Sequence, residues 1–159
     1  MTANSTLVQK TSDREVVVTR TFDCPARFVF EAWTTPELFT QWWVPRSLGA
    51  TLSFVKLDVR TGGSYRLVFG DDPAQQMAFH GRYLEVVPDS RIVWTNEEGE
   101  GEASVTTVTL DERDGQTHLT LSEVYPSKEA LDAAGTGAQD ALTETFDQLD
   151  EILATLRSR

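Results

Sequence analysis

The sequence predicts an α+β fold in which an antiparallel sheet packs against a long C-terminal helix, with two short helices after the first strand. Three observations predict it. A strand rich in β-branched residues is followed at once by two short apolar helical segments. A series of strand-like segments then follow one another across short turns. From residue 127 onward, apolar residues recur every three or four positions, which is the spacing of a helix.

The first strand is predicted at 15–22, and two short helices are predicted between Asp23 and Pro45. Asp23 is placed to cap the first helix, where Pro25 costs no hydrogen bond because the first-turn amides have no helical partner. Thr35 is placed to cap the second helix, with Pro36 at its first position. Three of the four tryptophans lie in this stretch. We interpret them as part of the wall of a cavity, because two helices that only supported the sheet would need fewer aromatic residues.

The middle of the chain predicts an antiparallel meander. Gly62 and Gly63 suit a tight hairpin turn, since glycine accepts the positive φ that such turns require. Pro88 and the Asp114-Gly115 pair mark two further turns. The predicted strands are 51–59, 64–69, 76–87, 91–96, 103–110 and 116–125. Parity along each strand places residues on one face or the other, but it does not say which face is inside.

The C-terminal part predicts a helix in two pieces. Ser127 caps a first segment, 128–134, and Gly135 and Gly137 interrupt the helix because glycine costs about 1 kcal/mol relative to alanine. The inward side chains of the second piece are small at its start and large at its end. Space is therefore predicted above the sheet near the start, unless a large aromatic side chain fills it. The inward residues are Gly137, Ala138, Ala141, Thr145, Leu149, Ile152, Leu153 and Leu156.

Several motifs recur in a characteristic order along the chain. They are Asp23-Cys24-Pro25, Val29-Phe30, Ala32-Trp33, Pro36-Glu37, Trp42-Trp43-Val44-Pro45, the stretch Asp58 to Tyr65, and the stretch Gly81 to Pro88. Their order and spacing resemble the SRPBCC superfamily, also called START-like or Bet v 1-like. Within it, the chain is most similar to the subgroup named after activators of the heat shock protein 90 ATPase. The resemblance covers residues 14–156, which we expect to form a single START-like ligand-binding domain after a flexible tail at 1–13.

The resemblance implies a helix-grip fold, in which a curved antiparallel sheet wraps around the long C-terminal helix and leaves a cavity between them. Combined with the strand parity and the small helix residues, it predicts a set of residues around a bound molecule. They are Trp33, Phe39, Trp43, Tyr65, Leu67, Phe69, Phe79, Tyr83, Trp94, Leu121, Glu123, Ala138, Ala141, Leu142 and Thr145.

Two glutamates share the parity of the predicted cavity face, Glu85 and Glu123. A carboxylate beside an apolar cavity can orient a ligand, or act as a general base if burial raises its pKa. The alternative is a carboxylate at the rim that pairs with an arginine such as Arg60 or Arg66. The sequence does not decide whether His80 or His118 faces the cavity.

Composition excludes several classes of function. The net charge of −11 opposes binding to nucleic acid or to an anionic membrane. No apolar run is long enough for membrane insertion, and residues 1–13 lack the apolar core of a signal peptide, so we expect a cytoplasmic protein. Cys24 is the single cysteine and is expected to be a small packing residue. Neither histidine lies in a metal-ligand spacing, and we expect no metal and no cofactor.

The function expected from these observations is the binding of a small hydrophobic or amphipathic molecule, such as a lipid, between helix and sheet. One alternative is an enzyme similar to polyketide cyclases or aromatases of the same superfamily. Another is a co-chaperone or protein-interaction module, as the subgroup name suggests. The eukaryotic activators carry an additional N-terminal domain, and only about 13 residues precede the first strand here, so chaperone binding is not the first expectation. The sequence leaves a homodimer open.

Overall fold

The computed structural model describes residues 6–49, 52–70, 72, 74, 76–97, 103–135 and 137–158, without the side chains of Leu48, Met77 and Ala138. Its described strands form one sheet in the order β1-β2-β8-β7-β6-β5-β4-β3, and all neighbours are antiparallel. The strands are β1 Leu7–Lys10, β2 Glu15–Phe22, β3 Leu52–Leu57, β4 Ser64–Phe69, β5 Met77–Val87, β6 Arg91–Asn96, β7 Ser104–Arg113 and β8 Gln116–Val124.

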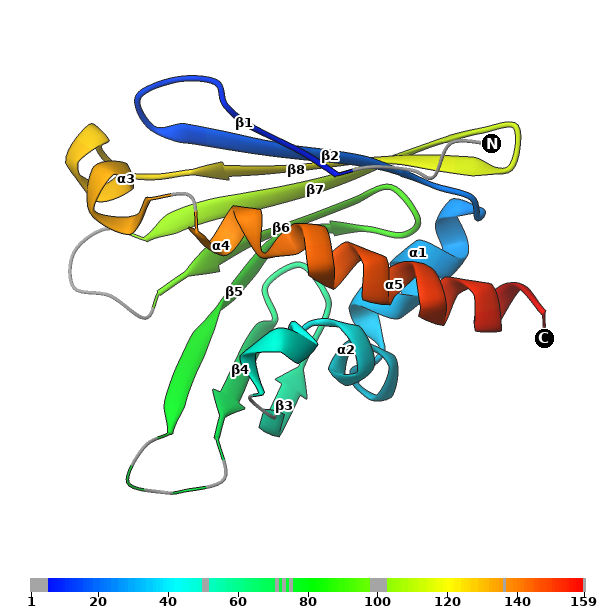
Figure 1. Ribbon diagram of the computed structural model, residues 1–159, viewed down its shortest axis with the longest axis horizontal. Helices are drawn as coiled ribbons and strands as arrows, with labels where there is room; N and C mark the ends of the chain where they lie inside the picture. The colour runs from blue at the N-terminus through cyan, green and yellow to red at the C-terminus, as the bar shows by residue number, and fades with distance from the viewer. Residues whose placement is uncertain are drawn as a thin grey trace.

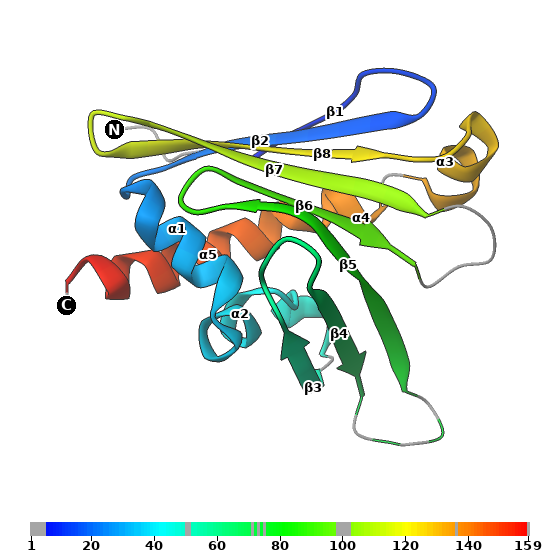
Figure 2. The same cartoon turned by 180° about the vertical axis from the view of Figure 1, so that it is seen from behind.

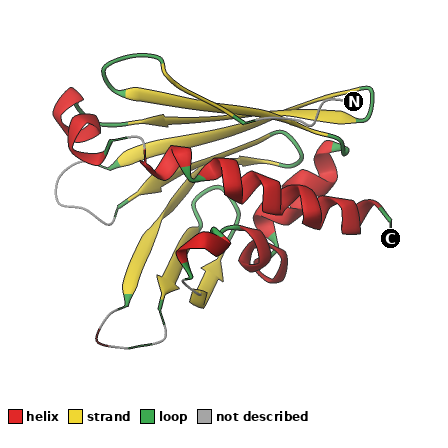
Figure 3. Cartoon of the chain, viewed as in Figure 1, coloured by secondary structure: helices red, strands yellow, loops and turns green. Residues whose placement is uncertain are grey.

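The helices lie on one side of this sheet (Figures 1 and 3). Their bounds are α1 Ala26–Thr34, α2 Pro36–Trp42, the 3₁₀ turn η1 Arg46–Leu48, α3 Lys128–Ala134, α4 Gly137–Asp140 and α5 Leu142–Arg157. The long helix α5 crosses the sheet, and α1 and α2 lie beneath it at one end, as the reverse view also shows (Figure 2). This arrangement confirms the predicted α+β helix-grip fold.

The chain begins differently from the prediction. Residues 7–10, which were expected in a flexible tail, form β1 and pair with β2 in the register Leu7 to Thr19 and Lys10 to Val16. Too few apolar residues precede β2 for the sequence pattern to mark a strand there. The tail prediction is therefore wrong for this segment, and β1 is one edge of the sheet.

Two predicted helix caps are also wrong. No side chain in the connection between β2 and α1 caps the helix. Instead, the carboxylate of Glu112, near the end of β7, accepts a hydrogen bond from the backbone amide of Ala26 at 2.8 Å. Thr35 precedes α2 without a side-chain cap, although Pro36 does occupy the first turn. At α1, a residue distant in the chain satisfies a helix terminus that the local sequence leaves open.

The predicted first piece, 128–134, and the break after it are confirmed, but the second piece is itself divided into α4 and α5 at Ala141. The hydroxyl of Ser127 accepts the amide of Ala130 over 3.1 Å, and Gly135 follows α3 with φ of 67°, a conformation that glycine adopts without strain. The buried side of α5 then packs on the sheet through Phe146, Leu149 and Leu153. No helix in the described part of the chain is long and apolar enough to cross a membrane.

A buried arginine on β2 joins α5 to the sheet. Arg20 points inward from β2 and is 4% exposed. Its guanidinium donates to Asp147 over 2.7 Å and pairs with Asp150 on α5. The pKa of Asp150 is raised, because burial outweighs the opposing effect of Arg20. Sequence parity alone would have placed an apolar residue at this inward position.

Candidate functional site

A cavity of about 440 Å³ lies between the sheet and the helices. Strands β3 to β8 form one wall, the segment from α4 into α5 covers it, and α1, α2 and the chain after α2 form one end. Such a volume falls within the usual range of small-molecule sites, roughly 300–1,000 Å³. Protein interiors are otherwise close-packed, so a space of this size needs a specific cause.

The aromatic end of the cavity is built by α1 and α2. Trp33 stands at its centre, with its ring 5.5 Å from Trp43 and 5.6 Å from Trp94 on β6. Phe39 stacks on Trp43 at 5.0 Å. Trp42 lies behind them in the core, fully buried, with its indole N–H bonded to the carbonyl oxygen of Ala32 at 3.0 Å. Trp33 and Trp42 are both buried, and Trp43 is the one of the adjacent pair that lines the cavity.

The sheet wall follows from strand alternation. Every second residue of β4 points inward, and the pairing of Leu67 with Phe79 continues the same face onto β5. Tyr65 and Tyr83 meet at 5.7 Å, and the ring of Phe69 lies 5.3 Å from that of Phe79. The hydroxyl of Tyr65 is satisfied by the carbonyl oxygen of Thr95 at 2.7 Å. This wall is therefore mainly aromatic, and the one hydroxyl described here, that of Tyr65, is bonded to the sheet.

The helical side of the cavity carries the small residues that the sequence predicted. Ala141 and Thr145 line it together with Leu142. The hydroxyl of Thr145 is bonded back to the carbonyl oxygen of Ala141 at 3.1 Å, so the threonine presents its methyl group. The side chain of Ala138 lies outside the described part of the structure. Because the large residues later in α5 pack on the sheet, the small ones leave space beneath them.

One polar group of side chains interrupts the apolar lining. Glu123 on β8 accepts from Ser104 at 3.0 Å and from the amide of Gln139 at 2.8 Å. Gln139 also donates to the hydroxyl of Tyr125 at 3.0 Å. Asn96 extends the group by donating to Ser104 at 3.0 Å. Glu123, Gln139 and Asn96 all line the cavity, so its apolar space has one polar wall.

The second glutamate faces away from the cavity. Tyr83 pairs with Trp94, but Glu85 pairs with Val93, so a β-bulge shifts the register between them. The extra residue reverses the parity of everything that follows it. Glu85 therefore lies outside, half exposed and paired with Arg91, and the prediction that it shares the cavity face with Glu123 is wrong. The partner is also neither Arg60 nor Arg66.

The histidines and the cysteine lie away from the cavity. His80 and His118 are exposed, and His118 contacts the hydroxyl of Thr21 at 3.1 Å. Cys24 is buried, and burial raises its pKa to about 11. Within the described residues, no cluster of three or more His, Cys, Asp or Glu side chains could hold a metal ion.

Tyr83, one of the two tyrosines that line the cavity, is neutral at physiological pH. Burial raises the pKa of Tyr83 well above its ordinary value, and the nearby Asp58 adds to the effect. Burial also raises the pKa of Tyr125, which lies beside the polar wall. Both hydroxyls are therefore hydrogen-bonding groups rather than bases.

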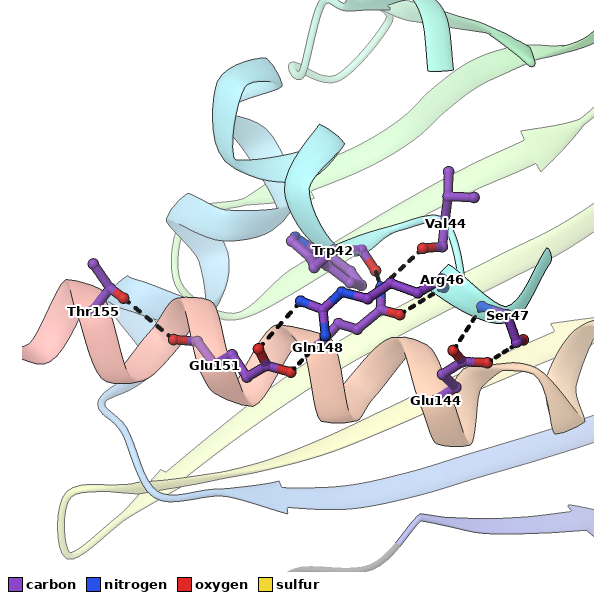
Figure 4. Close-up of polar contacts among 8 residues, drawn as sticks. All are labelled: Trp42, Val44, Arg46, Ser47, Glu144, Gln148, Glu151 and Thr155. Carbon is purple, nitrogen blue, oxygen red and sulfur yellow. Dashed lines mark hydrogen bonds and ion pairs between the residues drawn. The ribbon is translucent and has the colours of Figure 1, made fainter. Parts of the chain in front are cut away.

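The chain after α2 closes one side of the cavity through Val44 and Pro45. This irregular segment is fastened to α5 by side chains (Figure 4). Gln148 bonds to its backbone, Arg46 forms an ion pair with Glu151 at 3.0 Å, and Glu144 accepts from Ser47. These bonds attach the segment after α2 to α5.

The structure brings every predicted ligand-binding residue except Ala138 to this one cavity. Sequence reasoning missed others. Asn96 shares the parity of Trp94 and could have been found from it, and Thr106 is the cross-strand partner of Trp94. Gln139 gave no signal, because a polar residue on an amphipathic helix is usually assigned to the solvent side. The missed residues are Val44, Pro45, Leu57, Asn96, Thr106 and Gln139.

Comparison with known proteins identifies a family and a fold. The family model described as Activator of Hsp90 ATPase homolog 1-like protein matches residues 23–154. No curated protein matches the chain. Among solved structures, a Rhodobacter sphaeroides protein has a TM-score of 0.83 at 24% identity, covering 95% of this chain and 99% of that chain.

Two further solved structures show the same fold. A Nitrosomonas europaea protein has a TM-score of 0.80 at 22% identity, covering 94% of this chain and 100% of its own. An AHSA1-like protein of Aeromonas hydrophila has a TM-score of 0.68 at 15% identity, covering 85% of this chain and 92% of its own. At these identities the similarity establishes the fold alone.

Proposed function

Since the chain belongs to the family of activator of Hsp90 ATPase homolog 1-like proteins, within the SRPBCC superfamily, we propose that it binds a small apolar or amphipathic molecule between α5 and the sheet. The family gives the fold that makes a cavity. It does not choose the function, because one fold hosts unrelated activities.

The observation that carries the proposal is the cavity of about 440 Å³ with its mainly aromatic and aliphatic lining. Burying apolar surface of a ligand there is favourable by about 25 cal/mol per Å² removed from water. A few polar groups on one wall supply orientation, which is the usual composition of a small-molecule site. An apolar ligand with one or two polar substituents fits this combination.

The test is native mass spectrometry of the purified protein before and after denaturation. The expected result is an additional small mass per chain that is lost on denaturation. As a second readout, the protein is titrated with an apolar fluorescent probe. A protein that carries no small molecule and takes up no probe would contradict the proposal.

A second candidate function, acid–base catalysis on the bound molecule, is favoured by one observation. Glu123 lines the cavity and is held in place by Ser104 and Gln139. A positioned carboxylate beside a bound substrate can transfer a proton. Its test compares the molecules that co-purify with the native protein and with the Glu123→Gln variant. A different mass in the variant would support turnover, and the same mass in both would support binding alone.

Co-chaperone activity is the function that the family description names for other members. An interaction module needs no open cavity in its core, so the cavity of about 440 Å³ favours ligand binding. A pull-down with the cognate heat shock protein 90 separates the two. Binding that persists in an Ala141→Phe variant with a blocked cavity would favour the interaction module.

A further inference from the structure

The lining of the cavity carries charge of one sign. Among the described residues that form it, Glu123 has the only carboxylate, and none is a lysine, an arginine or a histidine. The other lining side chains are aromatic, aliphatic or neutral polar groups. A mainly apolar interior screens a charge less than water does, so a single carboxylate sets the sign of the electrostatic potential there. We therefore expect a negative potential inside the cavity.

The sheet directs Glu123 toward the cavity. Four lining residues are cross-strand partners in one row across β5, β6, β7 and β8, namely Tyr83, Trp94, Thr106 and Glu123. Leu121, two residues before Glu123 on β8, lines the cavity too, as the alternation of a strand requires. Thr106 is the smallest side chain of the row, and cross-strand neighbours are about 5 Å apart. A ligand group that lies above Thr106 is therefore next to the carboxylate.

Hydrogen bonds fix both oxygens of this carboxylate as acceptors. Ser104 accepts from the side-chain amide of Asn96 at 3.0 Å, so its own proton is directed at Oε2 of Glu123, also at 3.0 Å. The amide of Gln139 donates to Oε1 at 2.8 Å. These donors are neutral, so they orient the carboxylate without cancelling its charge. A charge in a protein interior is most stable beside an opposite charge, which a cationic ligand group would supply.

Glu123 also lies in a part of the lining that retains contact with water. Glu123, Asn96 and Ala141 are partly exposed, whereas Trp33 and Phe39 at the aromatic end are buried. An ammonium group beside Glu123 keeps more of its hydration than it would at the aromatic end, which lowers the cost of placing a charge in the cavity. The aromatic end suits an apolar body, because burial of apolar surface there is favourable.

We propose that the cavity binds an amphipathic amine, whose ammonium group pairs with Glu123 while its apolar body contacts the aromatic end. An anionic amphiphile, such as a fatty acid, would bring a second carboxylate next to Glu123, and like charges at short distance repel each other. The proposal rests on the proposed function and specifies the charge of its ligand. It makes Glu123 a binding residue that selects the head group.

The test uses three naphthalene compounds that share an apolar body and differ in the end group. 2-(1-Naphthyl)ethylamine is a cation at neutral pH, 2-(1-naphthyl)ethanol is neutral, and 1-naphthylacetate is an anion. Dissociation constants are measured by isothermal titration calorimetry. The amine is expected to bind the native protein roughly tenfold more tightly than the alcohol, the size of a hydrogen bond to a charged group. The acetate is expected to bind more weakly than the alcohol.

Two variants assign this preference to its residue. Glu123→Gln removes the charge and keeps an acceptor oxygen, so the amine should lose its advantage over the alcohol and the acetate should gain affinity. Glu85→Gln is the matched control, because it changes the net charge equally but lies outside the cavity, half exposed and paired with Arg91. The preference for the amine should persist in this control. The comparison of the three compounds on the native protein tests the charge preference even if Glu123→Gln fails to fold.

The outcomes separate the two levels of proposal. If the three compounds bind the native protein with equal affinity, the cavity takes up apolar molecules but the proposed charge preference is wrong. If none of them binds, the proposed function itself fails, and the charge preference fails with it. Equal loss of the preference in Glu123→Gln and Glu85→Gln would trace it to the net charge of −11 and overturn the role of Glu123. A preference that persists in Glu123→Gln would overturn that role as well.

Discussion

The side-chain amide of Gln148 donates to the carbonyl oxygen of Val44 over 2.8 Å. Val44 and Pro45 line the cavity, so this bond fixes part of the cavity wall to α5. The same side chain donates to the carbonyl oxygen of Trp42 at 3.0 Å and accepts from the amide of Arg46 at 2.9 Å (Figure 4). One buried glutamine therefore satisfies backbone groups that the irregular segment after α2 cannot satisfy itself.

Replacing Gln148 with leucine is expected to lower the free energy of unfolding by about 1–3 kcal/mol, because buried backbone groups lose their partner. It should also weaken uptake of an apolar probe, since the wall is no longer held. Chemical denaturation and a probe titration measure the two effects. Thr155→Val is the control on the same helix, because Thr155 is exposed and bonds only within α5. Equal stability of both variants would contradict this account of Gln148.

The connection between α5 and η1 is expected to weaken in acid. The pKa of Glu144 is lowered because its carboxylate accepts from the hydroxyl and then the amide of Ser47. The pKa of Glu151 is lowered in the same way by Arg46. Each carboxyl therefore binds its proton more tightly in the unfolded chain. Their contribution is present above the ordinary value of 4.5 and is lost as the pH falls below it toward the folded pKa.

The measurement is the urea midpoint between pH 7 and pH 3 for the native protein and for Glu144→Gln. The variant should show a shallower loss of stability in acid, because one of the linked carboxyls is gone. Parallel profiles would mean that Glu144 does not contribute to the acid sensitivity.

Enlarging Ala141 to phenylalanine tests whether the cavity is open. In a close-packed core the added ring would cost roughly 1–3 kcal/mol. Because Ala141 lines the cavity, we expect unchanged or higher thermal stability together with loss of probe binding. A thermal melt beside a probe titration distinguishes the cases. Strong destabilisation with unchanged probe binding would place the site elsewhere.

Gly81 is expected to tolerate no side chain. A Cβ atom there would lie 1.9 Å from the carbonyl oxygen of Thr95 and 2.8 Å from the ring of Tyr65. The backbone of β6 cannot retreat without losing the hydrogen bond from Tyr65 to Thr95. Gly81→Ala should therefore unfold the protein at a markedly lower temperature, or prevent folding.

The matched control is Gly137→Ala in α4, where nothing lies within 4 Å of the added atom. Alanine is favoured over glycine in a helix by up to about 1 kcal/mol, so this variant should be neutral or more stable. Similar melting temperatures for the two alanine variants would show that the close approach at Gly81 is not limiting.

The fold could be predicted from the sequence because its signals are local. The alternation within β4 and β6 and the cap at Ser127 are each written in a few adjacent residues, and the structure places these elements at the predicted bounds. The cap of α1 could not be predicted in this way. Glu112 lies far from Ala26 in the chain, and only the folded sheet brings them together.

The residues of the candidate site could likewise be predicted where the signal is local, and not where it depends on distant contacts. Parity and residue size indicated the aromatic wall and the small residues of α5, because both depend on periodicity. The bulge in β5 was invisible, since its extra residue carries no distinctive composition, and it turned Glu85 outward. The inward position of Gln139 was also hidden, because its reason is a bond to Glu123 on another strand.

Cys24 is a labelling site whose reactivity can report local opening of the structure. It lies buried at the corner between β2 and α1, where its carbonyl oxygen accepts from Thr117 at 2.7 Å. Only a thiolate reacts with an alkylating reagent, and with a pKa of about 11 the native thiol is protonated and shielded at neutral pH. Because it is the only cysteine in the chain, the rate of alkylation reports how often this one corner opens. A molecule bound in the cavity against α1 should slow the alkylation of Cys24. Thiol labelling would then report whether the cavity is occupied, although Cys24 itself lies outside the cavity.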